Sequence, residues 1–236
     1  MTLNSVFFHV VRFVAIVPAI VLHEVAHGYV AWRLGDPTAR DRGRLTLNPI
    51  AHIDLFGTIL LPILLLVLRT GFVFGYAKPV PINPSFFRNR SRGMLWVAAA
   101  GPLTNALLAA ATTLLGRLVL LVVDPSFLLQ TSMAAGLLRT VIALLYFFVV
   151  WNLVLALLNL IPIPPLDGSR ILAHFLPAEG RRAMASIERY GFFLLIALLA
   201  LGVLDRMFLF VVGGWDSLLG PRWQAVLIEW LRTLGL

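Results

Sequence analysis

The sequence alternates between long apolar stretches and short polar connections. Five apolar segments stand out, at residues 6–32, 55–68, 94–123, 134–161 and 187–204. An α-helix needs roughly 20 mostly apolar residues to cross a hydrocarbon core of about 30 Å, and only the segment at 55–68 falls well short of this length. The pattern predicts an all-α polytopic membrane protein with about four full transmembrane helices.

The short segment at 55–68 is followed by an apolar stretch punctuated by glycine and proline, GFVFGYAKPVPINP, at residues 71–84. The prolines disfavour a regular helix in this stretch. Extended backbone at membrane depth is tolerated only where it packs against protein or lines a wet cavity. We therefore expect a re-entrant element, in which a short helix enters the membrane and the extended stretch returns to the same side.

The C-terminal sequence WQAVLIEWLRTLGL, from Trp223 onward, alternates apolar and polar positions at helical spacing. This spacing predicts an amphipathic helix at the membrane interface rather than a further span. Since no internal repeat or linker-like segment interrupts the chain, we expect one membrane-embedded domain over residues 1–236. Its core is expected at residues 6–175, and a C-terminal span and tail at residues 187–236.

Composition agrees with a membrane protein. Hydrophobic residues make up 60% of the 236 positions and charged residues only 13%, about half the charged share of a soluble domain. The absence of cysteine excludes disulfides and thiolate metal sites, so any metal site must use His, Asp or Glu. The net charge of +8 comes from arginines that flank the apolar segments. Such flanking charge is typical of membrane orientation, and we expect no nucleic-acid partner.

The same basic residues predict an orientation. If the element at 55–84 re-enters the membrane, twelve basic residues fall on one face and six on the other. The twelve are Arg33, Arg40, Arg42, Arg44, Lys78, Arg88, Arg90, Arg92, Arg170, Arg181, Arg182 and Arg189. The positive-inside rule makes their face cytoplasmic.

The sharpest polar feature is HEVAH, from His23 to His27, inside the first apolar segment. Residues four apart on a helix share a face, so both imidazoles can reach one ion. Zinc suits such ligands, lowers the pKa of a water molecule and polarises a carbonyl, while Glu24 is placed to take a proton from that water. The alternative is a pair of histidines satisfied by hydrogen bonds between helices. Ionisable residues inside a membrane are costly, however, and commonly functional.

A catalytic zinc ion commonly has three protein ligands, so two histidines leave one position open. Asp167 is the only acidic residue between Asp124 and Glu179, and it follows the fourth apolar segment within NLIPIPPLDG. The prolines forbid a regular helix there, and Gly168 permits an unusual backbone turn. Asp167 is therefore a candidate third ligand. The alternative is that it caps the following helix, SRILAHFL.

Taken together, these motifs resemble those of the site-2 protease family of intramembrane zinc metalloproteases. Three motifs match in order: HExxH at residues 23–27, GPxxN at residues 101–105 and NxxPxxPxDG at residues 159–168. The LNPIAHID stretch, from Leu47 to Asp54, resembles the short bacterial subgroup of this family, and we expect no PDZ or CBS insertion. We expect a multi-pass protein of a prokaryotic plasma membrane. The zinc site is expected toward the cytoplasmic side, because His23 and His27 precede the basic cluster that begins at Arg33 by only a turn or two.

The resemblance also implies roles for particular residues. One Zn²⁺ ion per chain would be held by His23, His27 and Asp167, with Glu24 as the general base. Asn159 would position the substrate or stabilise the oxyanion, a role that suits an amide donor in a dry site.

The returning stretch at 71–84 resembles the family's membrane-embedded β-hairpin, which lies along the substrate. The substrate-binding residues implied are Phe74, Gly75, Tyr76, Ala77, Lys78 and Pro79. Structural support is expected from Gly101, Pro102, Asn105 and Gly168. For Asn105 we favour hydrogen bonds that hold the helices together over a catalytic role.

The function expected is hydrolysis of peptide bonds within or near transmembrane segments, as in regulated intramembrane proteolysis. The expected partners are a transmembrane protein substrate and the lipid bilayer, and a homo-oligomer stays open. Two alternatives are a zinc-binding transporter, which would not need Glu24 as a base, and a catalytically silent scaffold that binds membrane helices. Transporters commonly show paired repeats, whereas this chain has one polar site and no repeat.

Overall fold

The computed structural model describes residues 3–67 and 75–235, and within these ranges the secondary structure is helical, with no strand. Three helices are long and apolar enough to cross a membrane: α1 (Leu3–Arg33), α4 (Arg90–Val122) and α6 (Met133–Leu160). They correspond to the first, third and fourth predicted apolar segments. The prediction of an all-helical membrane protein is therefore confirmed.

Shorter helices make up most of the remaining described chain. Between α1 and α4 lie α2 (Thr38–Asp41), η1 (Pro49–His52), η2 (Leu55–Leu60), α3 (Leu61–Val67) and η3 (Pro84–Phe86). The short α5 (Pro125–Leu128) joins α4 to α6. After α6 come α7 (Asp167–Phe175), α8 (Ala178–Glu188), α9 (Gly191–Ala200), α10 (Val203–Leu219) and α11 (Pro221–Thr233).

The chain divides into two compact units. The first unit contains Met1–Ala19, Asn105–Leu155 and Asp205–Leu236, and the second contains Ile20–Thr104 and Ala156–Leu204. Each of the three long helices contributes residues to both units. The ionisable residues of the sequence motifs, His23, Glu24, His27 and Asp167, all lie in the second unit.

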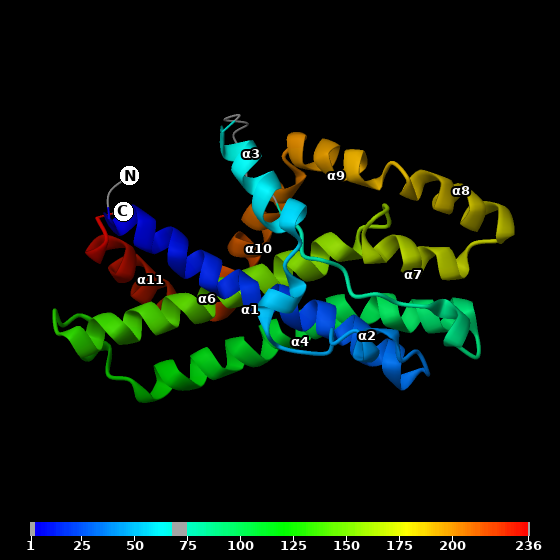
Figure 1. Ribbon diagram of the computed structural model, residues 1–236. Helices are drawn as coiled ribbons and strands as arrows, with labels where there is room; N and C mark the ends of the chain where they lie inside the picture. The colour runs from blue at the N-terminus through cyan, green and yellow to red at the C-terminus, as the bar shows by residue number, and fades with distance from the viewer. Residues whose placement is uncertain (1–2, 68–74, 236) are drawn as a thin grey trace. The chain divides into compact units, whose positions relative to one another are not determined.

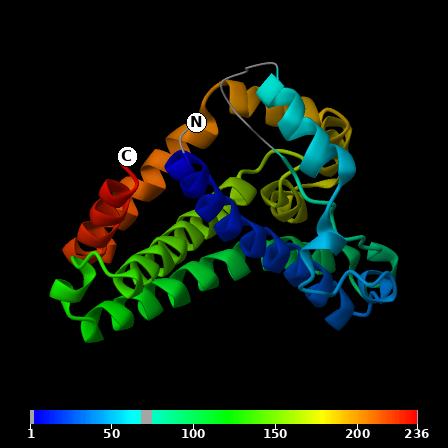
Figure 2. The same ribbon diagram turned by 60° about the vertical axis from the view of Figure 1, so that its left-hand side comes forward.

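In the first unit, α4 and α6 run side by side (Figures 1 and 2). A buried amide pair joins them, because Asn105 Nδ2 donates to Asn152 Oδ1 at 2.7 Å and to the carbonyl of Ala19 in α1 at 3.2 Å. The structural role expected of Asn105 agrees with these contacts.

The predicted amphipathic tail is present as α11 in the first unit. Its apolar face consists of Trp223, Val226 and Trp230, which are all buried. Trp230 lies against the ring of Phe8 and donates a hydrogen bond to Thr140 Oγ1. The apolar face of this helix is therefore covered by neighbouring helices of its own unit.

In the second unit, η2 continues directly into α3, and together they cover residues 55–67. Thirteen helical residues extend only about 20 Å, too short to cross a hydrocarbon core. Residues 75–83 then run back along this helix in an extended, non-helical conformation. Gly57 makes the close approach feasible, because a Cβ there would overlap the ring of Tyr76. The expected β-hairpin is not confirmed, since the described part of this stretch forms no strand ladder.

The fifth apolar segment, residues 187–204, is not a single helix. The chain there forms the end of α8, then α9, and then the start of α10 after a break at Gly202. Gly202 has a φ of +69°, a left-handed conformation that interrupts a helix. The structure therefore supports three candidate spans among the described residues, and the prediction of about four is not confirmed.

Candidate metal centre

Two buried imidazoles face the same point from α1. His23 and His27 are only 6% and 7% exposed, and they lie one helical turn apart, so their side chains project from the same face. Their Nε2 atoms are 3.0 Å apart, and the rings meet edge to face with centroids 4.6 Å apart. The helix thus presents two ring nitrogens to one position.

The orientation of His27 is fixed by α4. Its Nδ1 lies 2.7 Å from the carbonyl oxygen of Val97, which can only accept a hydrogen bond, so Nδ1 carries the proton. The lone pair of His27 is therefore on Nε2, the atom that faces His23. A backbone carbonyl in this position is the usual outer partner of a metal-binding histidine.

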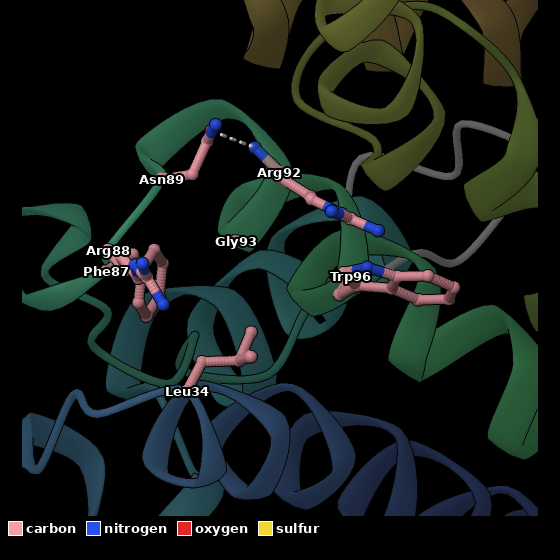
Figure 3. A pocket seen from close by; sticks show the side chains of 7 residues that line it. All are labelled: Leu34, Phe87, Arg88, Asn89, Arg92, Gly93 and Trp96. Atoms are coloured by element: carbon pink, nitrogen blue, oxygen red, sulfur yellow. Dashed lines mark hydrogen bonds between the residues drawn. The ribbon is translucent and has the colours of Figure 1, made fainter.

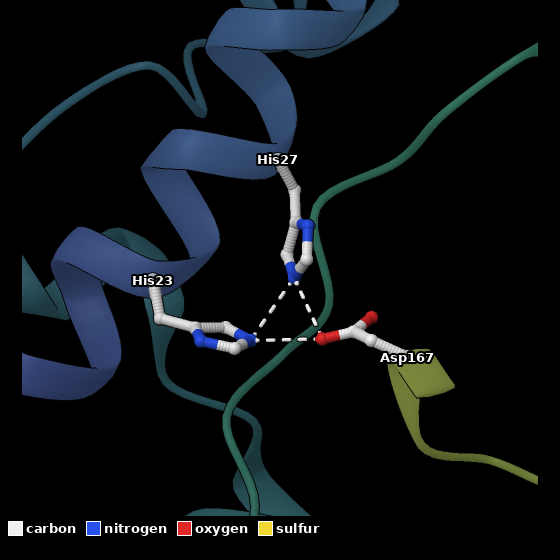
Figure 4. A group of neighbouring side chains, drawn as sticks. All are labelled: His23, His27 and Asp167. Carbon is white, nitrogen blue, oxygen red and sulfur yellow. Dashed lines mark hydrogen bonds and ion pairs between the residues drawn. The ribbon is translucent and has the colours of Figure 1, made fainter. Parts of the chain in front are cut away.

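Asp167 completes the group from the other end of the unit's sequence. It is 8% exposed, and its Oδ2 lies 3.2 Å from the Nε2 atoms of both His23 and His27 (Figure 4). Helix α6 ends at Leu160, the proline-rich turn follows, and α7 begins at Asp167 itself. Gly168 allows this arrangement, because a Cβ there would overlap the carbonyl of Leu160.

The capping role considered for Asp167 does not fit this geometry. The N-cap of α7 is Leu166, and no side-chain hydrogen bond caps the helix. Asp54, in contrast, does act as a cap, since its carboxylate accepts the N–H of Gly57 at the start of η2. His52 is buried and hydrogen-bonded to the carbonyl of Thr46. His174 Nδ1 forms a hydrogen bond with Ser91 Oγ, and neither His52 nor His174 belongs to the group formed by His23, His27 and Asp167.

The three ligand atoms fit a tetrahedral zinc ion. Bonds of about 2.0–2.1 Å would separate the ligand atoms by about 3.4 Å, and the observed separations of 3.0–3.2 Å are only slightly shorter. The buried Asp167 Oδ2 faces the two imidazole nitrogens and has no further hydrogen-bond partner among the described residues. Two imidazoles and a carboxylate are ligands that zinc prefers. No other group of this kind occurs in the part of the chain that the structure describes.

Helix α4 packs against the two imidazoles at Gly101, which has no side chain. A Cβ at this position would lie 2.5 Å from His23 Cε1 and from His27 Nε2. Any side chain there would displace the imidazoles, so glycine is required beside them. Pro102, the next residue, is buried within α4.

Glu24 is held by the extended segment. The backbone N–H of Val80 donates to Glu24 Oε2 at 2.9 Å. Gly28, one turn further along α1, lets the segment approach, because a Cβ there would lie 2.9 Å from the side chain of Val80. The carboxylate thus has one oxygen fixed by backbone, and its position depends on the segment at 75–83.

The extended segment at residues 75–83 forms hydrogen bonds to the rest of the unit at Tyr76, Lys78 and Val80. The N–H of Tyr76 donates to the carbonyl of Gly57, and the N–H of Lys78 to that of His52. Arg44 Nη2 donates to the carbonyl of Lys78 at 2.6 Å. No backbone hydrogen bond of the intervening Ala77 occurs among the described residues, so one edge of the segment stays open.

The other predicted residues fall as follows. Asn159 is half-buried in the last turn of α6, eight residues before Asp167. Gly75, Tyr76, Ala77, Lys78 and Pro79 all lie in the extended segment, whereas Phe74 is outside the described residues. Asn105 belongs to the amide pair of the first unit and is not part of the metal group.

Several residues of the site, and one of the amide pair in the first unit, are not indicated by the sequence analysis. Val97 and Val80 act through backbone groups, for which a single sequence carries no signal. Arg44 was assigned only to the orientation of the chain, and nothing in its neighbourhood pointed to Lys78. Asn152 could have been found, because an amide within an apolar span needs a hydrogen-bond partner.

Comparison with known proteins gives a consistent result. The family model of peptidase family M50 matches residues 11–202. A candidate zinc metalloprotease of Bacillus subtilis (strain 168), YwhC, is 39% identical over 78% of this chain and 78% of its own length. Proteins named Rip2, also candidate zinc metalloproteases, are 36% identical in Mycolicibacterium smegmatis and 34% in Mycobacterium tuberculosis (strain H37Rv). These matches cover 79% and 81% of this chain and 65% and 67% of the relatives.

No solved structure matches the chain. The family match covers all three motifs and every member of the metal group. The chain therefore belongs to peptidase family M50, the site-2 protease family of metallopeptidases that its motifs resemble.

Proposed function

We propose that this chain is an intramembrane zinc protease, which binds one Zn²⁺ ion through His23, His27 and Asp167 and hydrolyses peptide bonds within or near transmembrane segments. The observation that carries the proposal is the convergence of two Nε2 atoms and a carboxylate oxygen within 3.2 Å of one another. Two of the three ligands lie on a helix long and apolar enough to cross a membrane. Hydrolysis would therefore take place within the membrane. The whole chain is assigned to one protease domain.

Zinc in this site would supply a Lewis acid that polarises the scissile carbonyl and makes water more acidic. Glu24 takes the proton of the attacking water and later delivers it to the leaving amine. The N–H of Val80 holds Glu24 Oε2, so the other carboxylate oxygen is left for this proton transfer. Asn159 is assigned to the scissile carbonyl oxygen, to which its amide donates as negative charge develops.

The substrate backbone is assigned to the edge of the extended segment that carries the N–H and C=O of Ala77, which are unbonded among the described residues. Ala77 offers both an N–H and a C=O along this edge, while Pro79 and Pro81 have no N–H to donate. An added strand could therefore exchange a pair of backbone hydrogen bonds at Ala77, as in other cases of strand addition. Such pairing would replace the internal hydrogen bonds of a transmembrane helix while it unwinds for cleavage.

The orientation proposed places the metal centre toward the cytoplasm of a prokaryotic cell. The twelve basic residues assigned to the cytoplasmic face all belong to the second unit, which also contains the metal group. The six remaining described basic residues belong to the first unit. The short η2–α3 helix and the returning segment support a re-entrant element on that side.

Replacing Glu24 by Gln tests the function. The amide is nearly isosteric but cannot accept the proton, so we expect zinc to be retained and cleavage to fall by at least about 10²-fold. Quantitative proteomics of membranes that contain the wild-type protein or E24Q should show a single-pass protein that accumulates only with E24Q. The exposed Glu179→Gln is the matched control and should behave as wild type. Undiminished cleavage in E24Q would refute the assigned base, whereas zinc transport without proteolysis in the parent would favour a transporter.

A further inference from the structure

A pocket of the second unit lies where α1 ends and α4 begins (Figure 3). Its volume is about 520 Å³. Leu34 and Phe87 form part of its apolar lining, and Phe87 is anchored in a small core with Ala31 and Val97. A Cβ at Gly93 would lie 2.5 Å from the ring of Phe87, so glycine is required for this packing. The pocket is therefore built on a fixed apolar base.

Two guanidinium groups line the same pocket. Arg88 and Arg92 are both exposed, and among the described residues neither side chain makes an ion pair or a hydrogen bond. The backbone N–H of Arg92 is capped by Asn89 Oδ1, which fixes the first turn of α4. The pocket thus combines two unneutralised positive charges with the positive end of a 33-residue helix.

The pocket also lies at the ends of two candidate membrane spans, where a lipid headgroup would be expected. Both α1 and α4 are candidate spans, and the ends that meet here are packed together through Ala31, Phe87 and Val97. Trp96 lines the pocket and is 51% exposed, and Leu103, seven residues later on the same helical face, is 55% exposed. An apolar strip therefore continues from the charged pocket along α4, and tryptophan at its start is typical of a membrane interface.

We propose that this pocket binds the phosphate of an anionic phospholipid, with an acyl chain along the Trp96–Leu103 face of α4. The planar guanidinium forks of Arg88 and Arg92 match phosphate oxygens in geometry and charge. The adjoining apolar strip favours a lipid over an acidic protein segment, which would not need it. The site is separate from the metal group and does not depend on the proposed proteolysis.

The test compares two double variants of the full-length protein that remove equal charge. R88Q/R92Q alters the pocket, and R33Q/R42Q removes two exposed arginines of the same unit that do not line it. Binding of dioleoyl phosphatidylglycerol and dioleoyl phosphatidylcholine is measured by native mass spectrometry. We expect the wild type to retain one phosphatidylglycerol, and the pocket variant to bind it about tenfold more weakly than the control variant.

Four results would overturn the proposal. Equal losses in the two double variants would mean diffuse attraction to the basic surface. Equal binding of phosphatidylcholine would remove the requirement for negative charge. Inorganic phosphate binding as tightly as phosphatidylglycerol would identify a free-phosphate site, and displacement of the lipid by an acidic peptide would identify a protein partner.

Discussion

Two buried clusters of polar side chains, one in each unit, differ in their hydrogen bonding. In the first unit, Asn105 donates to Asn152 Oδ1 and to the carbonyl of Ala19, and Asn152 Nδ2 donates to the carbonyl of Phe148 at 2.7 Å. Both amides are fully buried, and each of these donors meets an acceptor. This cluster is complete without any further group.

The cluster of the second unit is incomplete. Two imidazole nitrogens and a carboxylate oxygen converge, and the proton of His27 is used elsewhere, on the carbonyl of Val97. His23 Nε2 can donate its proton to only one of the two acceptors that face it, His27 Nε2 and Asp167 Oδ2, whereas a cation between the three atoms would satisfy all of them. The comparison teaches that the number of acceptors left for each proton, rather than burial or polarity, separates the structural amide pair from the candidate metal site.

Crowding the incomplete cluster should have the largest effect. In Gly101→Ala the added Cβ would overlap both imidazoles, so we expect zinc affinity to fall by about 100-fold and cleavage with it. Metal competition with a chelator measures the affinity. Gly136→Ala is the matched control, since its Cβ would meet only Arg139 Nη2 at 4.0 Å. Normal zinc affinity in Gly101→Ala would show that the histidines are not held as described.

Removing the backbone donor to Glu24 should have a smaller effect, confined to catalysis. Val80→Pro deletes the N–H and is expected to lower kcat by roughly tenfold, because a general base contributes about 10²–10⁴-fold when well placed. Zinc content and KM should not change, whereas the pH profile of kcat should. Val80→Ala keeps the N–H and should retain a wild-type pH profile. A kcat lowered equally in both variants would assign the effect to packing instead.

Breaking the complete cluster should affect stability alone. Asn105→Leu leaves Asn152 Oδ1 without its donor and should cost about 1 kcal/mol of unfolding free energy, measured by denaturation in detergent. The double variant Asn105→Leu/Asn152→Leu should recover part of this loss, since neither amide is then left unpaired. Zinc content should remain at the wild-type level in both. Loss of zinc from either variant would show that the amide pair also supports the metal site, and would contradict a purely structural role.

Much of the fold could be predicted because it depends on local composition. The three long apolar helices were placed to within four residues, and a tail helix was expected from its spacing. The segment at 187–204 shows the limit of the same reasoning. Its hydropathy suits a span, but the left-handed backbone at Gly202 divides it, and composition does not reveal which glycine adopts that conformation.

The grouping of His23, His27 and Asp167 could also be predicted, because zinc restricts both ligand type and helical spacing. His23 and His27 follow from one turn of helix, and Asp167 from its isolation beside a proline-rich break. The groups that orient them could not be predicted in this way. The carbonyl of Val97 and the N–H of Val80 come from packing between segments about 70 and 56 residues away from their partners.

The most direct test of the metal centre is the zinc content of the purified protein and of Asp167→Ala, with the exposed Asp205→Ala as control. The ligand triangle predicts one zinc ion per chain in the wild type and in Asp205→Ala, and a substoichiometric amount in Asp167→Ala. Zinc content that is unchanged in Asp167→Ala, or a wild-type protein without stoichiometric metal, would contradict it.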